Sequence, residues 1–195
     1  MTPELRAIAD RFMYETATLK HLIAILPEGA LDRPVPGYKW NVRQLFAHLA
    51  ESLHTYCGPV ERWLRGDDPL SGWDPDAINA DTAERHRTAD AAALIASFDT
   101  GIVALVGAFA SIPEEKMHEP FGATEPLKAF HAFEGHCLGH AVPLIDAVTE
   151  VRMDPLVLNW LLFHSFEADA DRAWQRALLQ EAREYAANHP EEDEE

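Results

Sequence analysis

The chain has 195 residues, of which 47% are hydrophobic and 25% charged, so it is long and apolar enough to bury one core without a metal or a disulfide. Its 33 acidic residues outnumber its 16 basic ones, and the net charge of −17 argues against nucleic acid and anionic membranes as partners. It shows no signal-peptide pattern and no run of 18 apolar residues, and Cys57 and Cys137 are its two cysteines, so we expect a cytoplasmic protein with reduced thiols.

Helical periodicity recurs along the chain and strand signals are nearly absent, which predicts an all-α fold. Thr2 as a cap and Pro3 in the first turn predict a first helix that ends near Pro27. Asn41 and Gln44 have the spacing of a capping box, which predicts a second helix that continues to about Arg65.

A loop over residues 66–79 and a polar, potentially helical stretch follow the second helix. Thr88 is the expected cap of a third helix, whose apolar stripe runs from Leu94 to Ile112. A second loop then leads to the informative part of the chain.

Thr124 and Pro126 are expected to open a fourth helix, which reaches about Val151 and is apolar nearly all round. Asp154 and Pro155 are expected to open a fifth, and its inward face would carry Trp160, Phe163, Glu167, Ala170 and Trp174.

Four long amphipathic helices with short or moderate connections predict a four-helix bundle over residues 1–151. Residues 152–188 would form a C-terminal helical extension packed on the same domain. Residues 189–195 are an acidic run that we expect to be a frayed, solvated tail.

The fourth helix contains the pattern that bears on function. His136 and His140 are four residues apart, so they project from one side of the helix within about 40° of each other and can hold one ion. His48 is the leading third ligand, because it lies on the apolar face of the second helix. Three neutral imidazoles leave a coordination position open, as in catalytic zinc sites. The alternative is that all three are ordinary core histidines.

A resemblance to a known family adds to this interpretation. The segment LPEGALDRPVPGYKWNVRQLFAHLAE (residues 26–51) resembles the second-helix signature of the DinB/YfiT-like superfamily, in which a leucine-rich turn and a tryptophan precede a helix with a histidine eight residues after the tryptophan. The segment HCLGHAVPLID is similar to that superfamily's later pair of histidines followed by an apolar run. The resemblance covers roughly residues 1–150.

The resemblance implies a bundle, often a homodimer, that holds a divalent ion such as zinc or nickel on His48, His136 and His140. It also implies an enzyme related to thiol-dependent transferases and mycothiol-dependent maleylpyruvate isomerases, in which the metal activates a low-molecular-weight thiol. Two features depart from the superfamily: the helix after Met153 is additional, and AVPLID stands where an arginine usually follows the second histidine. The substrate and the dimer mode therefore stay open.

Other residues are weaker candidates for the site. Glu51 could orient a ligand or act as a catalytic base, or be an exposed glutamate. Cys137 could be a reactive thiol or a small buried residue, and Trp73 could cover a pocket or simply pack. Glu134 could pair with His131, but the sequence favours a surface position for Glu134, and His131 is expected to be structural or solvated. His164 and Glu167 offered a second metal site on the fifth helix, against simple packing. His21, His54, His86, His118 and His189 have no partner at useful spacing in the sequence and were expected to be structural or solvated.

The leading hypothesis is a divalent-metal-dependent enzyme, a transferase, isomerase or hydrolase, that activates a thiol cofactor or water against a small electrophilic substrate. The rival hypotheses are a noncatalytic metal- or ligand-binding bundle that acts as a dimerisation or interaction module, and a small-molecule sensor. The sequence alone does not choose among them.

Overall fold

The computed structural model describes residues 1–163 and 169–188, and within them all regular structure is helical. The expected all-α class is therefore confirmed. The α-helices, in chain order, are α1 (Pro3–Ile25), α2 (Val42–Thr55), α3 (Cys57–Leu64), α4 (Pro75–Arg85), α5 (Ala91–Ala110), α6 (Pro126–Ala147), α7 (Pro155–Phe163) and α8 (Asp169–Asn188).

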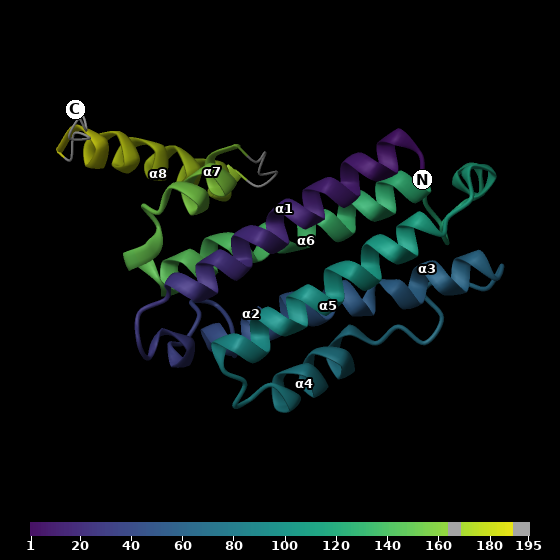
Figure 1. Ribbon diagram of the computed structural model, residues 1–195, viewed down its shortest axis with the longest axis horizontal. Helices are drawn as coiled ribbons and strands as arrows, with labels where there is room; N and C mark the ends of the chain where they lie inside the picture. The colour runs from purple at the N-terminus through teal and green to yellow at the C-terminus, as the bar shows by residue number, and fades with distance from the viewer. Residues whose placement is uncertain (164–168, 189–195) are drawn as a thin grey trace.

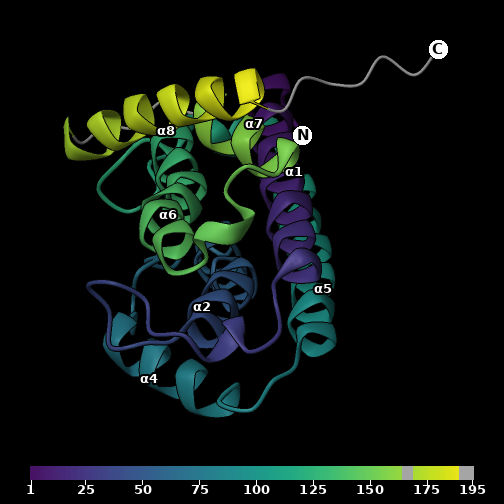
Figure 2. The ribbon, with the colours of Figure 1, turned by 90° about the vertical axis from the view of Figure 1, so that its left-hand side faces the viewer.

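Four long helices form the bundle. α1 contacts α5 and α6, and α2 contacts the same two helices, so the four close a ring around one core (Figure 1). The core is built from the apolar stripes that the sequence predicted, including Leu5 and Phe12 of α1 and Phe98 and Leu105 of α5, each at most 1% exposed. α4 lies along the outside of α2, while α7 lies beside α1 and α8 packs on α7 (Figure 2).

Two helix starts have the predicted local chemistry. The Thr2 side chain accepts a hydrogen bond from the Leu5 amide at 3.3 Å. Asn41 and Gln44 form a reciprocal capping box, with bonds of 2.9 and 3.1 Å. Each satisfies amide groups that have no partner within the first turn of a helix.

The predicted second helix is wrong in its length, because it breaks at Tyr56 into α2 and α3. Pro59 has no amide hydrogen and cannot donate to the carbonyl of Thr55, which removes the bond that would continue the helix. The loop expected over 66–79 is also too long, because Asp74 caps α4 by accepting from the Ala77 amide at 3.0 Å.

Three further boundaries differ from the prediction. Asp90, not Thr88, caps α5, and it accepts from the Ala93 amide at 2.8 Å. No side chain caps the start of α6, where the N-cap residue is Glu125, not Thr124. α6 ends at Ala147, and a short 3₁₀ helix, Thr149–Val151, follows it.

The C-terminal region holds two helices where one was predicted. α7 packs against α1, and Trp160 of α7 is fully buried. α8 contacts α7 and is tied to α6, because the Trp174 indole donates to the Asp146 carboxylate at 3.2 Å. His164, Glu167, His189 and the acidic tail over 189–195 lie outside the described residues.

Among the described helices, α5 alone is long and apolar enough to cross a membrane. Its buried residues, such as Leu94 and Phe109, pack in the bundle core, and Asp99 interrupts its apolar sequence. Packing against α1 and α2 accounts for this buried stripe, while Val103 on the outer face of α5 is 73% exposed.

Candidate metal centre

The structure brings the three predicted histidines to one point. His48 comes from α2, and His136 and His140 come from consecutive turns of α6, which packs against α2. The Nε2 atom of His136 lies 3.0 Å from that of His48 and 3.2 Å from that of His140. Zinc–imidazole bonds of 2.0–2.1 Å in a tetrahedral site place ligand atoms about 3.3 Å apart, which matches these two separations, and all three ligand atoms lie within 4.8 Å of one another. Among the described residues they form the one group of this kind.

The three imidazoles are held neutral. Burial lowers the pKa of His48 to about 4 and that of His140 to about 4. Burial, followed by the two neighbouring rings, lowers the pKa of His136 to about 3. Metal ions bind the unprotonated nitrogen, so this environment suits ligands at neutral pH.

Neighbouring side chains orient two of the three rings. The Tyr38 hydroxyl lies 2.8 Å from Nδ1 of His140, and with Nε2 turned to the centre this Nδ1–H donates to the hydroxyl oxygen. The Asn79 side chain hydrogen-bonds His48. Nδ1 of His136 is buried without a hydrogen-bond partner among the described residues. Two ligands therefore have the outer-shell support typical of metal-bound histidine.

A tight turn places Tyr38 at the centre. Pro36 and Gly37 are the middle residues of a turn closed by a 3.1 Å bond from the Tyr38 amide to the Val35 carbonyl. Gly37 has φ +78°, which a type II turn requires at this position and which glycine adopts without strain. Trp40 follows, and its ring centroid lies 4.9 Å from that of His48.

A cavity of about 220 Å³ opens beside His48 and His136. α2 and the segment from Trp73 through α4 form its walls. Its other lining residues are Glu51, Ser52, Thr55, Tyr56, Trp73, Pro75, Ile78, Asn79 and Thr82. Trp73 and Tyr56 present nearly parallel rings, with an interplanar angle of 10°.

Glu51 lines this cavity and is already paired. Its carboxylate lies 3.0 Å from Nε2 of His86 and 3.4 Å from the Arg85 guanidinium. The interaction with His86 links α2 to the end of α4. His86, which has no partner at useful spacing in the sequence, gains this one because α4 folds back over α2.

A second cluster of ionisable groups lies between α1 and α6. Glu134 accepts from Arg11 at 2.8 Å and lies 3.1 Å from His131, and it is 8% exposed. The preference for surface positions is thus wrong for Glu134, while His131 is exposed but paired. Glu15 is fully buried beside them, and burial, followed by the charge of Glu134, raises its pKa to about 8.

Cys137 faces this cluster and not the cavity. Its thiol hydrogen-bonds Glu15, and burial followed by the Glu15 and Glu134 charges raises its pKa well above the usual value. Thiolates are the reactive form of cysteine, so Cys137 acts as a small buried residue. Both cysteines are free thiols.

Two further histidines also have partners that sequence spacing did not reveal. His21 lies 3.0 Å from Asp154, and His54 lies 3.2 Å from the Thr100 hydroxyl. These contacts join helices remote in the sequence, so only the packed fold reveals them.

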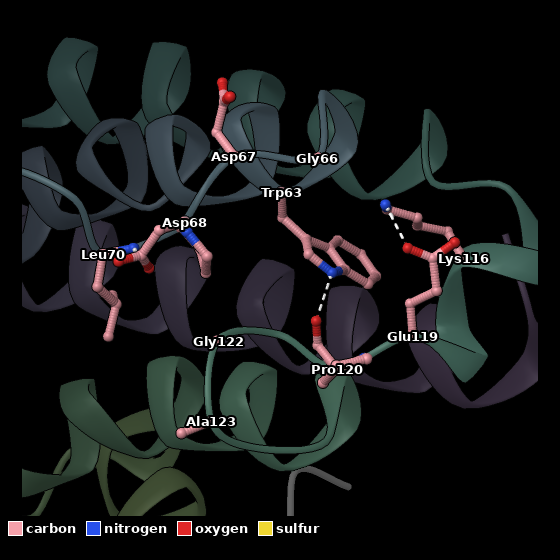
Figure 3. A pocket seen from close by; sticks show the side chains of 11 residues that line it. Trp63, Gly66, Asp67, Asp68, Leu70, Lys116, Glu119, Pro120, Gly122 and Ala123 are labelled. Carbon is pink, nitrogen blue, oxygen red and sulfur yellow. Dashed lines mark hydrogen bonds and ion pairs between the residues drawn. The ribbon is translucent and has the colours of Figure 1, made fainter.

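A larger hollow, of about 620 Å³, lies beside α3 and is not lined by any of the three histidines (Figure 3). Its Trp63 indole donates to the Pro120 carbonyl at 2.8 Å, and Lys116 is paired with Glu119 at 2.6 Å. Its main polar groups are therefore satisfied within the protein. Size alone does not select the functional cavity.

The bundle and its histidine group define a class of protein: a helical bundle with a three-histidine candidate metal centre on facing helices. The family model described as the mycothiol maleylpyruvate isomerase N-terminal domain matches residues 12–147, and the chain belongs to this family, which is of the DinB/YfiT-like type. No curated protein and no solved structure matches the chain. The resemblance inferred from the two histidine segments is thus confirmed.

Proposed function

We propose that the protein is a divalent-metal-dependent enzyme that activates a thiol or water against a small electrophilic substrate. His48, His136 and His140 hold the ion in this proposal. The observation that carries it is the meeting of three neutral imidazoles beside a cavity: Nε2 of His136 lies 3.0 and 3.2 Å from those of His48 and His140, and the three ligand atoms all lie within 4.8 Å of one another. A divalent ion there would supply Lewis acidity and an open coordination position.

Ligand chemistry supports the metal in this proposal, and the family description supports the thiol. Three imidazoles suit zinc or nickel, which bind nitrogen donors well. The family description names mycothiol, a low-molecular-weight thiol, which supports a thiol cofactor and a small-molecule substrate here. Glu51 is our candidate for the residue that orients or deprotonates a bound reactant, because it lines the cavity beside His48.

Elemental analysis tests the centre. The protein, purified without a histidine tag or chelator, should carry about one transition metal per chain, and His136→Ala should lose it while keeping its helix content. His118→Ala is the matched control, because His118 is exposed and outside the centre. Retained stoichiometric metal in His136→Ala, or no metal in the native protein after reconstitution with zinc and nickel, would refute the proposal.

One observation favours dimerisation, which is part of the enzyme proposal and the whole of the alternative, a noncatalytic dimerisation or interaction module. Val103 of α5 is 73% exposed and Met13 of α1 is 45% exposed, and they share a mostly apolar hollow of about 300 Å³. A second copy of the chain covering this face would make the homodimer that we propose. Sedimentation should then show a dimer that Val103→Glu converts to monomer, whereas an unchanged sedimentation coefficient would exclude this face.

A further inference from the structure

The cavity beside the histidines has the size of a single ring. An apolar protein cavity of about 150 Å³ holds benzene, and this one measures about 220 Å³. Tyr56, Trp73, Pro75 and Ile78 supply apolar and aromatic surface to its wall. Aromatic side chains favour stacked or edge-on contact with another ring. The volume and the aromatic part of the wall therefore suit a molecule of about one ring.

The charged residues in and near the cavity lining favour an uncharged ligand. Among the residues that the structure describes, no lysine or arginine lines the cavity, and Glu51 is the one carboxylate in its wall. The nearby Arg85 guanidinium is shared between Glu51 and Asp81, at 3.4 and 2.7 Å. Its charge is therefore already balanced. A carboxylate on a ligand would find no free cation in this wall.

Two hydroxyl groups of the wall, those of Ser52 and Thr55, are also engaged. Ser52 donates to the His48 carbonyl at 2.7 Å, and Thr55 donates to the Glu51 carbonyl at 2.8 Å. These bonds to the preceding turn of α2 use the single proton of each hydroxyl. Neither group is free to donate to a ligand anion.

We infer that this cavity selects an uncharged, flat substrate of about one aromatic ring and excludes dicarboxylates such as the maleylpyruvate in the family description. The inference rests on the proposed function, because it takes the cavity as the substrate site of the metal centre. A divalent ion, one thiolate and Glu51 sum to zero charge. Two ligand carboxylates would add uncompensated negative charge in a protein whose net charge is −17.

Calorimetric titration of three probes tests the inference. Benzamide, benzoate and maleate are titrated into the protein as purified, with 2-mercaptoethanol present to occupy an open metal position, and into chelator-treated protein. Benzamide should bind in both forms, benzoate at least about tenfold more weakly, and maleate without detectable heat. Equal or tighter binding of benzoate or maleate, or no binding of benzamide, would overturn the inference. Metal content, measured separately, decides the proposed function.

A charge placed in the wall provides the second test. Ile78→Lys puts a cation into the lining, and it should strengthen benzoate binding at least about tenfold without strengthening benzamide binding. Leu70→Lys is the matched control, because Leu70 is 53% exposed and does not line the cavity. Equal gains in both variants would mean that general charge, not the cavity, controls binding, and would overturn the inference. Trp73→Ala should weaken benzamide binding. An unchanged affinity of this variant for benzamide would also count against the inference. If a variant fails to fold, the order of the three probe affinities in the unmodified protein still tests the inference.

Discussion

Glu15 makes the free energy of unfolding depend on pH in a way that one substitution should remove. Its side chain is fully buried in α1, next to Glu134 and Cys137 of α6. Burial raises its pKa from 4.5 to about 8, so it is protonated in the folded protein at pH 7 and ionised in the unfolded chain. Glu15→Gln keeps the shape and removes the ionisation. We therefore expect the variant to be more stable than the native protein at neutral and alkaline pH.

The sign and the size of this pH dependence follow from the linkage between proton binding and folding. A raised folded-state pKa means that the contribution of Glu15 to stability is fully present below pH 4.5 and is lost as the pH rises to 8. Each pH unit in this window costs about 1.4 kcal/mol, so the loss approaches about 5 kcal/mol above pH 8 and about 3 kcal/mol at pH 7. Glu15→Gln should therefore match the native protein near pH 4.5 and exceed it by these amounts at higher pH.

Urea denaturation at pH 5, 6, 7 and 8 measures this difference. Both proteins are treated with a chelator first, so that metal loss at low pH does not contribute. Glu28→Gln serves as the control, because Glu28 is exposed and its substitution should leave the profile unchanged. A constant difference between Glu15→Gln and the native protein across this range would refute the assignment of a buried, protonated carboxyl.

Two further substitutions test the site and the packing. Tyr38→Phe removes the hydroxyl that orients His140, so the affinity for zinc in a chelator competition should fall about 10–100-fold with helix content unchanged; an unchanged affinity would show that the hydroxyl does not position this ligand. Gly101→Ala should lower the free energy of unfolding by about 1–3 kcal/mol, because its Cβ would lie 2.9 Å from the Leu53 Cβ across the α2–α5 contact. Gly107→Ala, on the same helix with nothing within 4 Å, should raise it by up to about 1 kcal/mol, and urea denaturation that shows the same sign for both would contradict this packing argument.

The sequence predicted the helices whose signals are local. The capping box of Asn41 and Gln44 and the stripe that buries Phe98 and Leu105 depend on residues three or four apart, and the structure has both. Asp74 and Pro75 were a start signal of the same kind, but they lay inside an expected loop. The break at Tyr56 was also readable, since Pro59 cannot continue the hydrogen bonds of α2.

The environment of the site could be predicted only in part. Helical spacing placed His136 and His140 on one side of α6, and the apolar face of α2 singled out His48. Tyr38 and Asn79 had no such signal, because a turn and a separate helix bring them to the histidines. Glu15 was detectable, since it lies three residues after Phe12 and four before Leu19 on the buried stripe of α1.

The metal ligands and the cavity wall come from different parts of the chain, and this separation has a functional consequence. The ligands stand on α2 and α6, whose packing is part of the bundle core. The apolar wall comes largely from residues 73–82, a segment that lies on the outer side of α2 (Figure 1). Apart from Asn79, which hydrogen-bonds His48, residues of this segment can be substituted to change the size and charge of the cavity without removing a ligand or a hydrogen-bond partner of one. Substrate preference can therefore change while the metal centre stays the same, so family membership supports the proposed metal chemistry more strongly than any one substrate.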